Sequence, residues 1–111
     1  MLYSKLAQLS DEEVSHNARI KKRVMLKTGD LPHVIGFSQA RFPAGEVAGS
    51  HKHDDMYEIF YVEQGQGLIR VDDQEIVLES GVCVSVAPGE CHEIENIGKE
   101  ELVVNYFGVI R

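Results

Sequence analysis

Short segments rich in valine, isoleucine, phenylalanine and tyrosine recur along most of this chain, and turns containing glycine, proline or aspartate separate them. These residue types favour β-strands, and the turn residues end each strand after a few positions. The strands predicted in this way are residues 20–27, 34–42, 56–63, 67–72, 75–78, 82–87, 92–95 and 102–110. Many short strands without a long helical period predict an all-β fold, an antiparallel sandwich or barrel that limits exposed sheet edges.

One short helix is predicted near the amino terminus. Ser10 followed by Glu13 resembles a capping box, in which the two side chains satisfy backbone N–H groups of a first helical turn. We therefore expect a helix from Asp11 to about Asn17. A chain of 111 residues is long enough for one core, so residues 1–111 are expected to form a single domain.

The charge and the absence of apolar runs exclude several classes of partner. The net charge of −7 at pH 7 opposes nucleic acid binding, which requires a basic surface. The basic run Lys21-Lys22-Arg23 is interpreted as a solvated edge strand. No apolar run reaches the roughly 18 residues of a membrane-spanning helix, and the amino terminus has no export signal pattern. We expect a cytoplasmic protein with no nucleic acid or membrane partner, in which Cys83 and Cys91 are free thiols.

Residues 45–65, GEVAGSHKHDDMYEIFYVEQG, place two histidines and a glutamate within a few positions. His51 and His53 are two apart, so on an extended strand both imidazoles project from one face and can converge on one point. Glu58 can resume that inward face after the intervening turn. A pair of solvated loop histidines is the alternative interpretation of the HxH pattern taken alone.

Residues 81–96, GVCVSVAPGECHEIEN, form a second cluster. A turn at Pro88-Gly89 would deliver His92 to the mouth of a strand, with Ile94 and Asn96 on the same face. Three imidazoles and one carboxylate make a mixed nitrogen and oxygen ligand set. Such a set suits Fe, Mn, Ni, Cu or Zn rather than Ca or Mg.

The two clusters resemble the two motifs of the cupin family. The first motif, G-x5-H-x-H-x4-E-x6-G, matches residues 45–65 at every position and spacing. The second, G-x5-P-x-G-x2-H-x3-N, matches residues 81–96 except that Ala87 stands at the usual first proline. The resemblance implies a double-stranded β-helix, or jelly-roll, barrel. It also implies one divalent transition metal, with Fe or Mn favoured over Ni, Zn or Cu, held by His51, His53, Glu58 and His92.

A substrate pocket is expected beside this metal. Phe60 and Val62 follow the glutamate inward by strand parity, and Ile94 shares the face of the third histidine. Gln39 is added from the preceding strand, on the assumption that it faces inward together with Phe37. The sequence does not decide whether further side chains line the pocket, namely Tyr57, Tyr61, Tyr106 and Arg41.

Four protein ligands on a six-coordinate metal leave two adjacent positions, enough for a bidentate substrate or for substrate plus dioxygen. This arrangement favours a metal-dependent, dioxygenase-like oxidoreductase acting on a small enol, diketone or phenolic compound, with no catalytic residue assigned. A metal-dependent sugar isomerase or epimerase is a second enzymatic interpretation. A non-catalytic module that binds a metal or a small ligand is the alternative from another class, since one barrel hosts many chemistries.

A homodimer is expected as well. Cupin resemblance implies that an amino-terminal segment, within residues 1–30, adds to the partner's sheet. Residues 20–27, IKKRVMLK, carry apolar side chains on both faces. That pattern suits a strand covered on two sides, and a partner subunit would supply the second cover.

Overall fold

The computed structural model describes residues 1–111, and nearly all of its regular structure is β. A 3₁₀ turn at Leu6–Gln8 precedes ten strands: β1 (Glu12–Val14), β2 (Asn17–Leu26), β3 (Val34–Phe42), β4 (Val47–Lys52), β5 (Tyr57–Gln64), β6 (Gly67–Val71), β7 (Gln74–Leu78), β8 (Cys83–Val86), β9 (Cys91–Asn96) and β10 (Leu102–Val109). The predicted all-β class is confirmed. Every strand expected from the sequence is present, and β1 and β4 are additional. None of the helical structure is long and apolar enough to cross a membrane.

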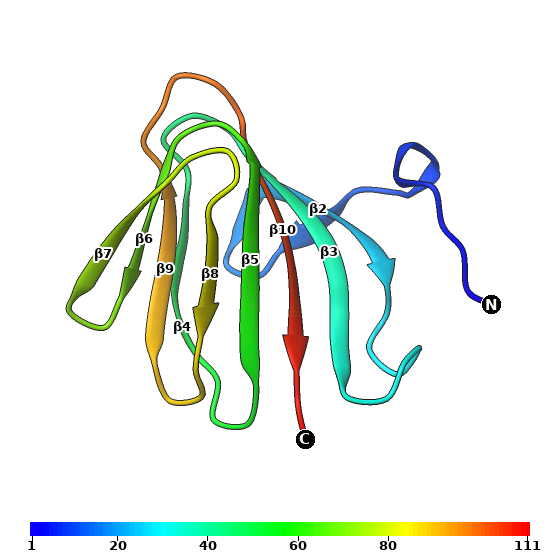
Figure 1. Ribbon diagram of the computed structural model, residues 1–111. Helices are drawn as coiled ribbons and strands as arrows, with labels where there is room; N and C mark the ends of the chain where they lie inside the picture. Colours follow the sequence, from blue (N-terminus) through cyan, green and yellow to red (C-terminus); the bar gives the residue numbers. More distant parts are fainter.

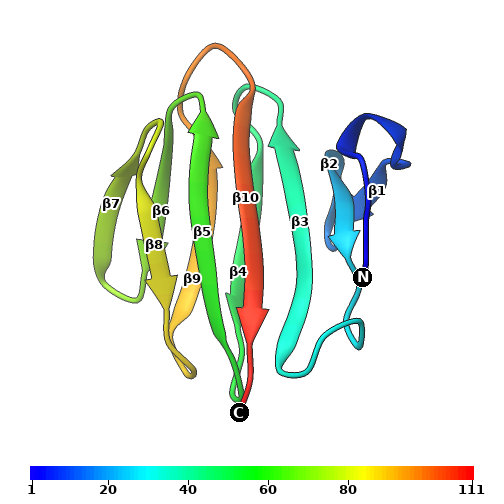
Figure 2. The ribbon, with the colours of Figure 1, turned by 45° about the vertical axis from the view of Figure 1, so that its right-hand side comes forward.

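The strands form two antiparallel sheets that face each other (Figure 1). The order is β1-β2-β3-β10-β5-β8 in the six-stranded sheet and β4-β9-β6-β7 in the four-stranded sheet. At the centre of each sheet the neighbours are distant in sequence: β10 lies between β3 and β5, and β9 lies between β4 and β6. Figure 2 shows the four-stranded sheet behind the six-stranded one. This is the jelly-roll arrangement that the motif resemblance implies.

The space between the sheets holds one apolar core. Both sheets contribute to it, because each strand turns alternate side chains inward. In β9, for example, His92, Ile94 and Asn96 are buried and the residues between them are half-buried. Burial of apolar side chains is the main stabilising term of a small domain. The aliphatic side chains of this core that are almost completely buried are Ile20, Val62, Ile69, Leu78, Leu102 and Val104.

The helix predicted from Asp11 to about Asn17 is wrong. Glu12–Val14 is strand β1, and β2 begins at Asn17 and pairs with it. Asp11, expected as the first residue of the helix, instead forms ion pairs with Arg23, at 2.9 Å, and with Arg41. Its hydrogen bond from Arg23 and the charge of Arg41 lower the pKa of its carboxyl. Pairing with β2 and the packing of Val14 on the core therefore override a local capping pattern.

Asn96 ties the two sheets together at one end of the barrel. Its side chain is 1% exposed, and its amide nitrogen donates to the carbonyl oxygens of Phe42 at 2.9 Å and Glu100 at 2.8 Å. Its amide oxygen accepts from the N–H of Gly98 at 2.9 Å. The backbone of Gly45 also donates to the carbonyl of Asn96 at 3.1 Å. The asparagine of the second motif is thus a structural residue that fixes the ends of β3 and β9.

Candidate metal centre

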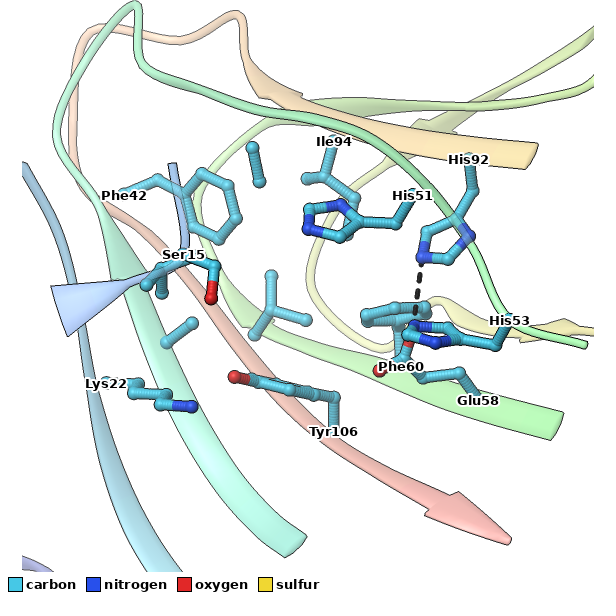
Figure 3. Close-up of a pocket in the computed structure, with 14 residues that line it drawn as sticks. Ser15, Lys22, Phe42, His51, His53, Glu58, Phe60, His92, Ile94 and Tyr106 are labelled. Atoms are coloured by element: carbon cyan, nitrogen blue, oxygen red, sulfur yellow. Dashed lines mark ion pairs between the residues drawn. The ribbon is translucent and has the colours of Figure 1, made fainter. Parts of the chain in front are cut away.

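A cavity of about 230 Å³ opens between the sheets and is lined by 14 residues (Figure 3). More than half of the lining is apolar, and the side chains that provide most of it come from both sheets: Ala40, Phe42, Ala48, Phe60, Ile94 and Val104. The volume is below the roughly 300–1,000 Å³ of pockets that bind drug-sized molecules. The cavity therefore suits a small organic molecule.

The four residues of the predicted metal site all line this cavity. His51 lies on β4 and His53 directly after it, whereas Glu58 lies on β5 and His92 on β9. The Nε2 atom of His92 is 3.1 Å from Oε1 of Glu58, and that of His53 is 3.6 Å from the same oxygen. One ligand atom from each of these three residues lies within 4.8 Å of the others. A single ion can therefore contact all three.

His51 lies beside this group rather than inside it. Its ring centroid is 5.9 Å from that of His92 and 6.4 Å from that of His53. His51 pairs with His92 in the register of β4 and β9, so the two side chains are cross-strand neighbours on the cavity face. The structure thus brings all four residues to one end of the cavity, and three of them form the tightest cluster.

The charges around Glu58 fit a bound cation. Its side chain is only 13% exposed, and its ion pairs are with the two imidazoles and with no lysine or arginine. A largely buried carboxylate needs a positive partner, because desolvation of an unpaired charge is costly. In His92 the Nδ1 atom is buried without a hydrogen-bond partner, so no neighbouring group fixes the tautomer of this ring. A divalent metal held by Nε2 of His92 and by Glu58 would supply the positive partner of the carboxylate and would leave the ring proton on Nδ1.

A turn from the second motif supports His53 through the backbone. The N–H of Gly89 donates to the carbonyl of His53 at 2.7 Å. Within the turn, the N–H of Ala87 donates to the carboxylate of Glu90 at 2.7 Å. A proline at position 87 would have no N–H to donate. The departure from the motif at Ala87 is therefore matched by a hydrogen bond that only a non-proline residue can make.

The expected pocket residues have different outcomes. Phe60 and Ile94 line the cavity, whereas Val62 follows the same inward parity but is fully buried in the core behind it. The expectation for Gln39 is wrong. It lies on the outer face of β3, where its side chain donates to that of Asn105 at 3.1 Å.

The error over Gln39 arises from the assumption about Phe37. Phe37 packs edge to face against Phe107, with ring centroids 5.8 Å apart, on that same outer face. The cavity residues of β3 are Ala40 and Phe42, which have the other parity. Because β3 carries apolar residues on both faces, alternation alone does not identify the inward one.

Of the side chains that the sequence left undecided, only Tyr106 lines the cavity. Tyr57 and Tyr61 are 47% and 48% exposed, and Arg41 pairs with Asp11 outside the barrel. The ring of Tyr106 stacks on Phe60 at a centroid distance of 5.8 Å. Burial, with the negative charge of Glu58, raises the pKa of Tyr106 to about 12. Its hydroxyl is therefore a hydrogen-bond donor at neutral pH.

Sequence reasoning missed two polar residues of the cavity, Ser15 and Lys22. The solvated-edge interpretation of the basic run is wrong for Lys22, because β2 pairs with β1 on one side and β3 on the other. Lys22 shares the inward parity of Ile20, which is fully buried. The sequence signal that could have identified Lys22 is Ile20, an apolar residue two positions earlier on the same face of the strand.

The comparisons with known proteins agree with this architecture. Residues 38–108 match the family model described as a cupin domain. An oxalate-binding protein from Thermotoga maritima is 32% identical over 66 residues, which are 60% of this chain and 54% of the relative. An uncharacterized protein from Methanocaldococcus jannaschii is 33% identical over 67 residues, with the same two shares. The chain therefore spans about half the length of the curated relatives it matches.

Among solved structures, the crystal structure of a predicted oxalate decarboxylase from Thermotoga maritima superposes with a TM-score of 0.92. The match covers 99% of this chain and 100% of that chain at 21% sequence identity, so it shows a shared fold. The jelly-roll topology, the two motifs and the family match lead to one conclusion: the chain belongs to the cupin family.

Proposed function

We propose that this protein binds one divalent transition metal, Fe or Mn in preference to Ni, Zn or Cu, and uses it to bind a small organic molecule. The observation that carries the proposal is the convergence of His53, Glu58 and His92, whose ligand atoms lie within 4.8 Å of one another at one end of a cavity. His51, on the same wall, is the fourth proposed ligand.

The bound metal would supply Lewis acidity and, for Fe or Mn, a route for electrons. The chain's own residues have simpler tasks. Phe60 and Ile94 exclude water from the space beside the histidines, and Tyr106 offers a neutral hydroxyl to an oxygen of the ligand. No side chain here is assigned as a catalytic acid or base.

The first candidate activity is a dioxygenase-like oxidation of a small enol, diketone or phenolic compound. Mixed imidazole and carboxylate ligation with open positions is the ligand set of iron centres that use oxygen. The apolar wall supports this candidate, because it limits the access of water to a reactive centre.

The second candidate is binding of a small acid without turnover. It is supported by the Thermotoga maritima relative named an oxalate-binding protein, at 32% identity over 66 residues. Oxalate presents two adjacent carboxylate oxygens, which suit two neighbouring open positions on a metal.

Oxygen uptake and ligand binding separate the two candidates. The protein is loaded anaerobically with Fe(II) or Mn(II), its metal content is measured, and oxygen consumption is followed with a panel of enols, diketones and catechols. Uptake that is abolished by His53→Ala supports the dioxygenase-like candidate. Tight metal-dependent binding of oxalate with no uptake supports the binding candidate. A protein that takes up neither metal contradicts the proposal as a whole.

We also propose that the protein is a homodimer held by its amino-terminal arm. Within the chain, β3 pairs with β2 along one edge, and β1 pairs with Asn17, Lys21 and Lys22 on the other. Ser4 donates to the carbonyl of Met25 in β2 at 3.2 Å, so the amino-terminal arm runs beside this strand, where Leu2 and Tyr3 are 56% and 83% exposed. Light scattering of the full chain at micromolar concentration tests this. We expect a dimer that Tyr3→Asp shifts toward monomer, and a monomeric full chain contradicts the proposal.

A further inference from the structure

The cavity has two polar ends separated by apolar side chains. The histidines and Glu58 form one end. At the other end, the ammonium group of Lys22 and the hydroxyl of Tyr106 point toward each other, with the hydroxyl of Ser15 nearby (Figure 3). Phe42 and Val104 are among the apolar side chains that line the same cavity. A ligand that fills the cavity therefore meets polar groups at both of its ends.

Lys22 is placed at this end by strand pairing. It lies opposite Ala40 in the register of β2 and β3, and Tyr106 lies opposite Ser38 in the register of β10 and β3. The small side chain of Ala40 leaves room above β3 for both longer side chains. Because this placement depends on the backbone ladder, the two polar groups are held by rigid elements and not by a loop.

The charge of Lys22 has no partner within the chain. Lys22 takes part in none of the ion pairs of the structure. Glu12 lies opposite it on β1 without forming an ion pair, and both residues line a second cavity that Tyr106 also lines. Glu58 also borders that second cavity but pairs with the imidazoles. A half-buried lysine without a paired carboxylate is available to an anionic ligand.

Tyr106 complements this charge. Its ring is fixed by stacking on Phe60, and its hydroxyl stays protonated because burial raises the pKa of Tyr106 to about 12. A neutral phenol beside an ammonium group gives two hydrogen-bond donors that face the same space. Two adjacent donors are suited to the two oxygens of a carboxylate.

We propose that Lys22 and Tyr106 form a carboxylate-binding subsite, so that the ligand of this cavity is a small dicarboxylic acid with a chain longer than that of oxalate. The inference rests on the proposed function in one respect, because it places the other end of the ligand at the metal site. Oxalate would fill only the metal end. Lys22 and Tyr106 therefore determine specificity for the length of the acid.

Matched pairs of acids test this subsite. Succinate is compared with butanoate, and glutarate with pentanoate, by calorimetric titration of Mn(II)-loaded protein and of metal-free protein. The members of each pair have the same chain length and differ in one carboxylate. Lys22→Gln and Tyr106→Phe remove the two donors, whereas Lys21→Gln removes a lysine of the opposite parity on the same strand and is the matched control.

We expect at least one dicarboxylate to bind about tenfold or more tightly than its partner monocarboxylate. That preference should be lost in Lys22→Gln, reduced in Tyr106→Phe and kept in Lys21→Gln, and oxalate affinity should stay the same in the control Lys21→Gln. Equal binding of both members of each pair, or a preference that survives Lys22→Gln, overturns the subsite. Metal content, measured on the same samples, reports separately on the proposed metal site, and the metal-free titrations measure the Lys22 dependence even without a metal.

Discussion

The Nε2 atom of His92 on β9 lies 3.1 Å from the carboxylate of Glu58 on β5, and these strands belong to different sheets. His53 reaches the same carboxylate oxygen from the end of β4, at 3.6 Å. A metal bound there would cross-link the two sheets through side chains. Metal occupancy and the stability of the fold are therefore expected to change together.

The first prediction concerns this link. Excess Mn(II) should raise the free energy of unfolding by about 2.7 kcal/mol at 100 times the dissociation constant, because the metal binds the folded state only. His51→Ala, His53→Ala and His92→Ala should each weaken metal binding by more than about tenfold and remove about half or more of this stabilisation. Elemental analysis and thermal unfolding with and without metal measure the two effects.

His33→Asn serves as the control for these variants. His33 lies outside both motifs and has a φ of 69°, a conformation that asparagine tolerates. The His33→Asn variant should bind metal with the same affinity as the unaltered protein. Full metal occupancy in any two of the three alanine variants would rule out the assigned site.

A second prediction follows from the pKa of Tyr106, which burial and the charge of Glu58 raise from 10.0 to about 12. The unfolded chain loses the phenolic proton near pH 10, whereas the folded chain keeps it to about pH 12. The contribution of Tyr106 to stability is therefore complete below pH 10 and decreases by up to roughly 3 kcal/mol as the pH rises from 10 to 12. Ultraviolet titration of the metal-free protein should show one of the four tyrosines ionising late.

Tyr106→Phe should remove the late-ionising phenol and leave the other transitions in place. In this variant the free energy of unfolding should also depend less on pH between pH 10 and pH 12. Ionisation of all tyrosines together near pH 10 in the folded protein would contradict the buried environment described for this residue.

A third prediction is that two glycines of the first motif differ in the stability lost when each is replaced by alanine. Gly45 and Gly65 have φ values of 81° and 93°, which alanine adopts at a cost of about 1–2 kcal/mol. A Cβ atom at Gly45 meets nothing within 4 Å, whereas one at Gly65 would lie 2.6 Å from the carbonyl oxygen of Glu101. Chemical denaturation should show a loss of about 1–2 kcal/mol for Gly45→Ala and roughly 3 kcal/mol or more for Gly65→Ala. Equal losses would show that backbone conformation alone explains both glycines.

A fourth prediction assigns Asn96 to the fold rather than to the metal. Asn96→Ala removes three side-chain hydrogen bonds from a buried position and leaves the carbonyl of Phe42 without its donor. We expect a loss of about 2–4 kcal/mol in the free energy of unfolding. Metal affinity of the folded variant should stay within about threefold of the unaltered protein, a factor worth less than 1 kcal/mol.

Asn105→Ala is the matched control for this variant. Asn105 lies half-buried on the outer face of β10, and its side chain bonds with Gln39 and Glu63. Its loss should be about 1 kcal/mol or less. A loss of metal affinity in Asn96→Ala, without a loss of stability, would contradict the structural assignment.

The sequence by itself determined the parts of this protein that depend on neighbours along the chain. The strand class follows from local residue types and turns, and the shared face of His92, Ile94 and Asn96 follows from the period of an extended strand. The spacing of His51, His53 and Glu58 is likewise a local pattern. The strand class and the shared face of β9 are present in the structure because they depend on local geometry, whereas His53 lies directly after β4 and meets Glu58 of β5 only through the tertiary arrangement.

Only the tertiary structure decided which face of an ambiguous strand turns inward. β3 has apolar side chains on both faces, so pairing with β10 and β2, and not alternation, places Ala40 at the cavity and Gln39 outside. Pairing with β2 likewise converted the expected helix around Glu13 into a strand. Lys22 reaches the cavity only because β1 and β3 flank its strand. The free energy of these choices comes from contacts between segments far apart in sequence, which no local pattern encodes.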